Sequence, residues 1–124
     1  MFSPYIRIIP VSNLSTQEFL GIILSKIHHS SHLSEIWKII RPENQSHSDF
    51  LFFGLSKKLY RNIALFKISK SLQYIDFQIT PHKYGSPSSF VLYAGMIAAL
   101  ADFMIENFNS KINNITLYNF TPID

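Results

Sequence analysis

Residues Phe90–Phe108, FVLYAGMIAALADFMIENF, form the apolar stretch around which we expect the rest of this chain to fold. Within it, residues 90–101 carry no polar side chain except the Tyr93 hydroxyl. A helix that is apolar on all sides is normally buried on all sides. The stretch therefore predicts a long helix, ending at Asn109 or Ser110, that is buried in the centre of the fold.

This helix is not expected to cross a membrane. Asp102 interrupts the apolar run after twelve residues and Glu106 follows it, whereas a span takes about 20 apolar residues. Gly95, Ala98 and Ala99 form a smooth strip along the same helix, and we assign this strip to a close contact with a sheet.

The N-terminal third is expected to contain a strand and two helices. Residues 5–11, YIRIIPV, are rich in strand formers. Ser15-Thr16-Gln17-Glu18 is a capping box, and it predicts a helix over residues 16–29. Apolar residues at helical spacing predict a second short helix over residues 33–40, ended by Pro42.

The remaining segments predict further strands. The polar run at residues 43–49 is expected to be a loop. Residues 50–55, 62–69, 72–80 and 115–120 have strand character. The order is therefore β-α-α-β-β-β-α-β, which favours one α+β domain over residues 1–124. We expect a mainly antiparallel sheet of about four to five strands, packed on the long C-terminal helix and an N-terminal helical pair.

Composition points to a protein partner. Charged residues make up 15% of the chain, against about 25% in ordinary soluble domains, and aromatic residues also make up 15%. Charge depletion and aromatic enrichment are typical of interface cores. A homodimer or another protein would cover this surface. The net charge of +3 is compatible with an acidic or toxin partner but does not by itself indicate one. The expected contact residues are Phe52, Lys57, Lys58, Tyr60, Arg61 and Phe66.

The function expected from these features is non-enzymatic protein binding, with no cofactor. A toxin-neutralising immunity or inhibitor protein is one form, and a secretion or assembly adaptor is another. The chain has no cysteine, which excludes disulfides and thiolate metal sites and suits a reducing cytoplasm. The start of the chain lacks a basic region followed by an apolar core, so we expect no signal peptide.

The loop before the long helix supports an alternative function. It places basic, aromatic and hydroxyl side chains near a helix N-terminus, where an anion can bind; these are His82, Lys83, Tyr84, Ser86 and Ser88. An anion-binding protein or a small ribonuclease-like enzyme is the corresponding hypothesis. Much of the loop is also explained as helix punctuation, because Ser86 is a good N-cap and Pro87 a good first helical residue.

Basic and aromatic residues around residues 57–70 allow nucleic-acid binding, which we do not favour. Such side chains on a sheet can stack on bases and contact phosphates. The chain lacks a recognised reader motif, however, and lysines near strand ends also guard sheet edges.

Other polar clusters are better explained without chemistry. His28, His29 and His32 fall close together, but a metal needs more ligands than their spacing supplies, and we expect no metal site. His47-Ser48-Asp49 places triad residue types next to one another, whereas triad members meet through the fold. Asp102 and Glu106 lie four apart and are expected to face solvent.

Overall fold

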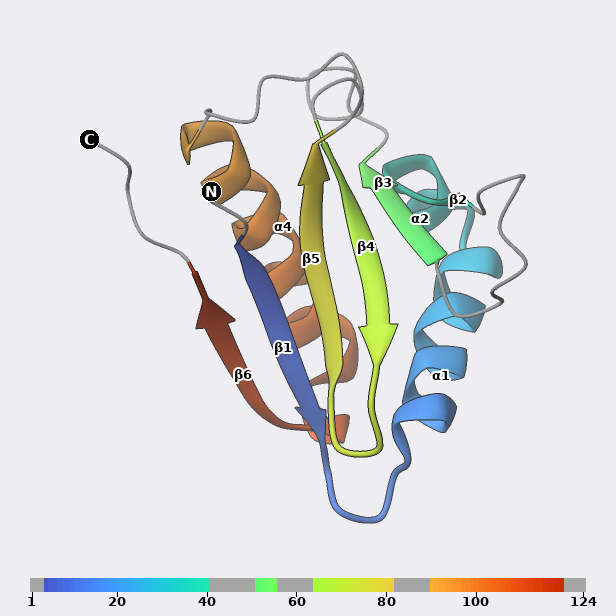
Figure 1. Cartoon of the computed structure of the whole chain (residues 1–124). Coiled ribbons are helices and arrows are strands. Elements are labelled where there is room, and N and C mark those ends of the chain that lie inside the picture. Colours follow the sequence, from blue (N-terminus) through green and yellow to red (C-terminus); the bar gives the residue numbers. More distant parts are fainter. Residues whose placement is uncertain (1–3, 41–50, 56–63, 82–89, 120–124) are drawn as a thin grey trace.

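The computed structural model describes residues 4–40, 51–55, 64–81 and 90–119 (Figure 1). The elements follow one another along the chain as β1 (Tyr5–Pro10), α1 (Thr16–His28), α2 (Ser31–Ile36), β2 (Trp37–Ile40), β3 (Leu51–Leu55), β4 (Ala64–Lys70), β5 (Ile75–Pro81), α4 (Phe90–Phe108), the short 3-10 helix η1 (Asn109–Lys111) and β6 (Ile112–Tyr118).

The strands form one antiparallel sheet in the order β2-β3-β4-β5-β1-β6. The predicted α+β class, the antiparallel sheet and the long C-terminal helix are confirmed. The sheet has six strands, more than the sequence predicted. β1 lies between β5 and β6, so the first and last strands of the chain are neighbours (Figure 1).

The additional strand is β2, in the segment predicted to continue the second helix. α2 ends at Ile36, and the chain is extended from Trp37 onward. Pairing with β3 and burial of the Trp37 ring against Phe66 and Phe103 replace the helical turn that the apolar spacing favoured. The prediction of a helix over residues 37–40 was therefore wrong, because the partner strand outweighs local periodicity.

Helix α1 begins where the capping box predicts. The Ser15 hydroxyl accepts a hydrogen bond from the Glu18 N–H at 3.1 Å, and the Glu18 carboxylate accepts one from the same hydroxyl at 3.1 Å. The apolar face of α1 is buried against the sheet. Thr16, also buried, donates its hydroxyl to the Ser71 carbonyl oxygen at 2.6 Å, which ties α1 to the β4–β5 turn.

Helix α4 has the predicted bounds but not the predicted burial. Its large side chains face the sheet at spacings of three and four residues; these are Tyr93, Met96, Ile97, Leu100, Phe103, Met104 and Phe108. Ala98 is exposed, Gly95 and Ala99 are partly exposed, and Ile105 is half exposed. The helix is therefore buried on one side only, and the small-residue strip does not face the sheet. Small apolar side chains can face solvent at little cost, because they expose little area.

The described helices lie on one face of the sheet, and none of them covers the other face, which we call the open face (Figure 1). The buried residues of α1, α4 and the strands belong to one hydrophobic cluster, and α4 lies behind β1 and β5 in the view of Figure 1. No described helix is long and apolar enough to cross a membrane.

Candidate functional site: the open face of the sheet

Alternation along β1 separates the core face from the open face. Ile6 and Ile8 are buried in the core, whereas Tyr5, Arg7 and Ile9 are partly exposed on the other face. Successive side chains of a strand point to opposite faces of a sheet. The open face is therefore built from every second residue of each strand.

Strand register brings two rows of these residues together. Tyr5 lies opposite Tyr118 on β6 and Gln78 on β5. Gln78 in turn lies opposite Lys67 on β4. The second row places Arg7 between Asp76 and Thr116.

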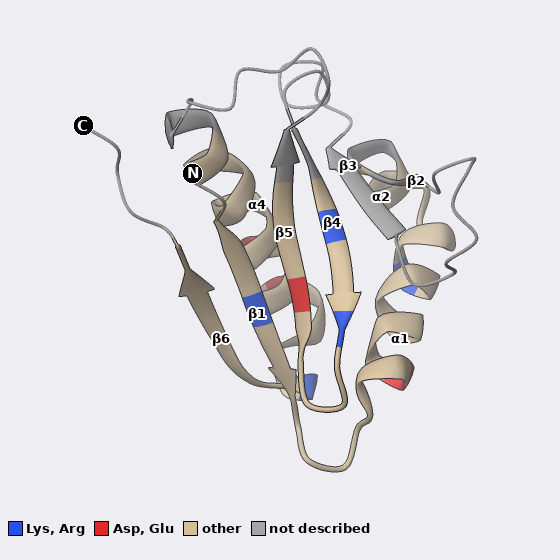
Figure 2. Ribbon diagram, viewed as in Figure 1, with Lys and Arg blue, Asp and Glu red and all other residues tan. Residues whose placement is uncertain are grey.

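Arg7 and Asp76 form a two-point ion pair across these strands. The Arg7 Nε donates to Asp76 Oδ1 at 2.9 Å, and the Arg7 Nη2 donates to Asp76 Oδ2 at 3.0 Å. Both side chains are partly buried, with exposed fractions of 22% and 16%. Parallel hydrogen bonds of this kind fix the plane of the guanidinium as well as its position. Figure 2 shows the basic position on β1 beside the acidic position on β5.

Three tyrosine rings surround the same guanidinium. The Arg7 Cζ atom lies 3.6 Å from the ring centroid of Tyr74, 4.9 Å from that of Tyr118 and 5.6 Å from that of Tyr5. The rings of Tyr5 and Tyr118 stack with their centroids 5.0 Å apart and their planes 12° apart. Contacts between a cation and an aromatic face are attractive and orient the ring. We call Tyr5, Arg7, Tyr74, Asp76 and Tyr118 the Arg7 cluster.

The electrostatics of the Arg7 cluster keep Arg7 charged. The hydrogen bonds to Asp76 and the charge of this carboxylate raise the pKa of Arg7 above its already high ordinary value, and this outweighs the opposing effect of desolvation. Arg7 therefore cannot act as a proton donor or acceptor near neutral pH. The cluster is suited to recognition through shape, π faces and hydrogen bonds, rather than to acid–base chemistry.

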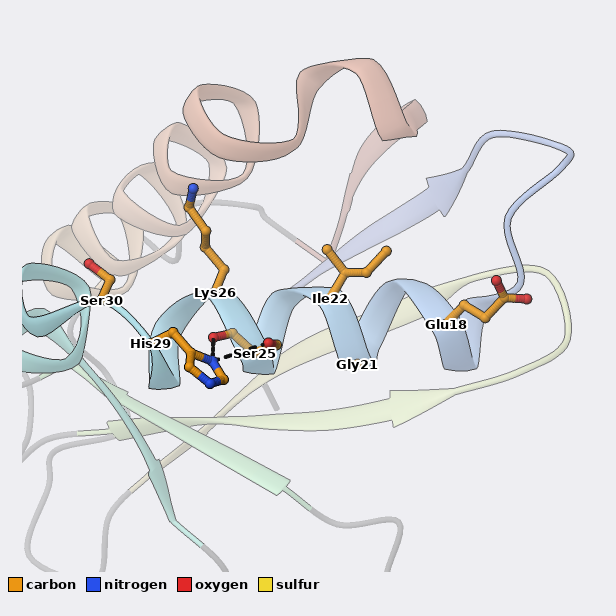
Figure 3. A pocket seen from close by; sticks show the side chains of 7 residues that line it. All are labelled: Glu18, Gly21, Ile22, Ser25, Lys26, His29 and Ser30. Atoms are coloured by element: carbon orange, nitrogen blue, oxygen red, sulfur yellow. Dashed lines mark hydrogen bonds between the residues drawn. The ribbon is translucent and has the colours of Figure 1, made fainter.

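A shallow hollow of about 790 Å³ runs along the exposed side of α1 (Figure 3). Its lining includes Glu18, Ile22, Lys26 and His29. The Nδ1 atom of His29 donates to the Ser25 carbonyl oxygen at 2.9 Å, so this ring caps the C-terminal turn of the helix. The role of His29 visible here is structural.

A second hollow of about 430 Å³ lies between α1, α2 and α4. Asp102 and Glu106 line it together with Lys26 and His32. Both carboxylate residues are exposed, as the sequence predicted. Their exposed position does not give the desolvation that usually prepares a carboxylate for acid–base catalysis.

The neighbouring histidines do not converge on a ligand site. The rings of His28 and His29 meet edge to face with their centroids 5.1 Å apart. Among the described residues, no three His, Cys, Asp or Glu side chains are grouped so that they could hold a metal ion.

Most residues that the sequence analysis assigned to sites lie outside the described part of the chain. This holds for the anion-site residues His82, Lys83, Tyr84, Ser86 and Ser88, and for the contact residues Lys57, Lys58, Tyr60 and Arg61. Those assignments stay predictions. The backbone of Phe52 lies in β3 opposite Lys67.

The prediction that Phe66 contacts a partner was wrong. Its side chain is 0% exposed and lies in the core, where its ring neighbours that of Trp37. Phe66 therefore cannot contact a partner in the folded protein. Alternation in β4 explains this, because Lys67 takes the open face and Phe66 the helix-covered face.

The Arg7 cluster was not predicted from the sequence. The signal was present in part, since Tyr74, Asp76 and Gln78 alternate with isoleucine and phenylalanine in the third predicted strand. The sequence did not indicate which strand lies next to this one in the sheet. The residues of β1 and β5 are 69 positions apart at the Arg7–Asp76 pair, and local pattern does not show that these strands are adjacent.

Comparison of this chain with protein-family models, curated proteins and solved structures finds no match, so a function has to be inferred from the geometry of its own residues.

Proposed function

We propose that this protein is a protein-binding module that docks another polypeptide on the open face of its sheet. The observation that supports the proposal is the Arg7 cluster, which gathers three tyrosines and an arginine on a face that no described helix covers. Tyrosine and arginine are enriched among the residues that contribute most to protein–protein binding.

The Arg7 cluster is already ordered without a partner. Asp76 holds the guanidinium at two points, and the stacked rings of Tyr5 and Tyr118 restrict one another. Immobilising a flexible side chain on binding costs about 0.5–1.5 kcal/mol. Rings that are held before binding avoid part of this cost, which favours the face as a docking surface.

The expected partner has an acidic contact surface. The described open face carries Lys67 as well as the Arg7–Asp76 pair, and the whole chain has a net charge of +3. Charge complementarity of this kind mainly sets specificity and association rate. A toxin-neutralising immunity or inhibitor protein, or an adaptor for secretion or assembly, is a concrete form of such a module.

Single-stranded nucleic acid is the second candidate for the same face. The tyrosines and Lys67 are side-chain types that bind bases and phosphates. Two features favour a polypeptide instead. The stacked rings of Tyr5 and Tyr118 already use one face of each ring, and the charge of Arg7 is already paired with Asp76.

A pair of charge-reversal variants tests the proposal. The tagged protein is used to capture partners from its native cells, captured polypeptides are identified by mass spectrometry, and each is then titrated as a purified protein. Lys67→Glu changes the open face and should weaken binding at least about tenfold. Lys26→Glu, on α1, makes the same charge change away from this face and should leave binding unchanged.

A parallel titration distinguishes the second candidate. Fluorescence anisotropy with labelled oligo-dT and oligo-rU measures nucleic-acid binding over a range of salt concentrations. The protein-binding proposal fails if no polypeptide binds the open face while these oligonucleotides bind in a salt-dependent manner that Lys67→Glu abolishes. It also fails if a captured partner binds both variants equally well.

A further inference from the structure

The two edges of the sheet differ in how well they are protected. β2 has four residues, Trp37–Ile40, and includes Lys38. β6 has seven residues, Ile112–Tyr118, and none of them is charged (Figure 2). Natural proteins commonly guard edge strands with short length, charge or proline. Within Ile112–Tyr118, β6 has none of these protections.

The outer side of β6 has no strand partner among the described residues, because β6 is the last strand of the sheet order. Its only strand neighbour there is β1. An edge strand presents backbone N–H and C=O groups that can pair with another chain. β6 is therefore open to strand addition.

Two exposed large apolar side chains lie on the same edge. Four large hydrophobic side chains are exposed among the described residues. Leu117 and Tyr118, at 47% and 36%, lie on β6 itself. The other two are Ile105 on α4, at 50%, and Leu72 at the β4–β5 turn, at 96%.

Ile105 lies on α4 outside the hollow between α1, α2 and α4. Ala99, Asp102 and Phe103 line the hollow on the side of α1 and α2. A turn of about 100° per residue places Ile105 and Ala101 on the opposite flank. Figure 1 shows α1 and β6 on opposite sides of α4.

We propose that β6 pairs antiparallel with β6 of a second copy of this chain, about a two-fold axis at Thr116. An axis perpendicular to the sheet keeps the helices of both copies on one face, so only residues that share a face can lie opposite each other. Ile115 and Leu117 share the helix-covered face, because their partners on β1 are the core residues Ile8 and Ile6.

The position of the axis follows from matching these side chains. An axis at Thr116 places Ile115 opposite Leu117 of the second copy, and the reverse, so two apolar pairs form. An axis at Ile115 would place Leu117 opposite the polar Asn113 instead. Apolar pairs directly opposite each other are the favourable cross-strand arrangement.

A second copy fits this edge because the strand is neutral. When two copies of one strand pair about a two-fold axis, a net charge on the strand is repelled by the same net charge on its copy, and like charges directly opposite are destabilising. The absence of charge from Ile112–Tyr118 removes this repulsion. The resulting sheet would run through both copies and place their two Arg7 clusters on one continuous open face.

Sedimentation velocity over a wide concentration range tests the oligomeric state. The protein should show a reversible dimer. Leu117→Lys should weaken this dimer by about tenfold or more, because the lysine would lie in the apolar contact. Leu72→Lys is the matched control, since Leu72 is 96% exposed at the β4–β5 turn, and it should dimerise as the unchanged chain does.

Cysteine cross-linking tests the register of the two β6 strands. Because the chain has no native cysteine, only the introduced cysteines can form disulfides. Under mild oxidation Thr116→Cys should form a disulfide-linked dimer, whereas Leu72→Cys should not. Asn114→Cys and Tyr118→Cys should cross-link with each other when mixed, but not each with itself.

Three results would overturn the proposal. They are a strict monomer at every concentration, a dimer that Leu117→Lys leaves intact, and a disulfide dimer of Asn114→Cys alone. Circular dichroism of each variant confirms that the fold is retained. Partner capture through Lys67 concerns a different surface, so failure of dimerisation leaves the proposed protein-binding function separately testable.

Discussion

Arg7 on β1 and Asp76 on β5 are joined by two hydrogen bonds of 2.9 and 3.0 Å, across a separation of 69 residues in the sequence. The pair coincides with a position at which the two residues lie directly opposite each other in the β1–β5 register. It therefore joins the N-terminal strand to the middle of the sheet and holds the guanidinium among the tyrosine rings.

The Arg7–Asp76 pair should behave as one unit in a double-mutant cycle. Arg7→Lys keeps the charge but cannot make the same two-point contact, and Asp76→Asn removes the charge of the acceptor. Each variant should lower the melting temperature. The double variant should lose less unfolding free energy than the two single variants lose in sum. Thermal unfolding at several salt concentrations measures these losses. Strict additivity would show that the pair is not coupled.

Removal of the Thr16 hydroxyl should destabilise the fold. Thr16 is buried and donates to the Ser71 carbonyl oxygen at 2.6 Å. Thr16→Val keeps the shape but leaves this carbonyl without that donor, and it should lower the free energy of unfolding by about 1–2 kcal/mol. Urea denaturation measures the loss. Thr16→Ser retains the hydroxyl and should lose less, so equal losses in the two variants would point to packing instead.

Replacement of Gly21 by alanine should stabilise the protein. Gly21 lies inside α1 and is exposed, and an added Cβ would meet nothing within 4 Å. Alanine is favoured over glycine in a helix by about 1 kcal/mol, so the melting temperature should rise by about 4 °C. Gly21→Pro should instead cost about 3 kcal/mol. A destabilised alanine variant would mean that this position is not helical.

Truncation of Phe66 should cost stability. Because this side chain is fully buried, Phe66→Ala should lower the free energy of unfolding by about 3–5 kcal/mol. Phe66→Leu fills most of the same space and should cost much less. Chemical denaturation of both variants checks this. A fully stable Phe66→Ala protein would show that the ring is not part of the core.

Stability should fall at high pH through Tyr93. Burial raises the pKa of Tyr93 above its unfolded value of about 10. Well below a pH of about 10, the Tyr93 hydroxyl is protonated in both the folded and the unfolded protein, so the contribution of Tyr93 to the free energy of unfolding is fully present. As the pH rises further, the unfolded state ionises first and unfolding becomes more favourable.

The measurement for Tyr93 is a comparison of unfolding free energies at pH 8 and about pH 11. The unchanged protein should lose more stability between these values than Tyr93→Phe, which cannot ionise at this position. The other tyrosines and the lysines are common to both proteins, so their effects cancel in the comparison. Equal losses would exclude a contribution from Tyr93.

Several features could be predicted from the sequence because short-range interactions decide them. The start of α1 at Thr16 follows from the Ser15 cap, whose hydrogen bond reaches only to Glu18. The bounds of α4 follow from its apolar run and the residues that flank it. The sequence also indicated the antiparallel α+β class, since consecutive strand patterns favour a sheet of neighbouring strands.

Other features depend on contacts between distant residues. The local pattern of residues 37–40 suits a helix, yet β3 supplies a strand partner and the core accepts the Trp37 ring. The pattern of α4 shows that it is apolar but not which side meets the sheet. Likewise, the aromatic and basic residues of β4 did not reveal that Phe66 faces inward.

By itself, the sequence of this protein determined where the main helices begin and end, because caps and periodicity act within one or two turns. Only the tertiary structure decided that β1 lies between β5 and β6. That position brings Arg7 to Asp76 and to the tyrosines, and it leaves β6 at the edge of the sheet. The physical reason is that strand pairing uses backbone groups that every strand offers, so the choice of neighbour depends on which arrangement buries the apolar faces of the whole chain.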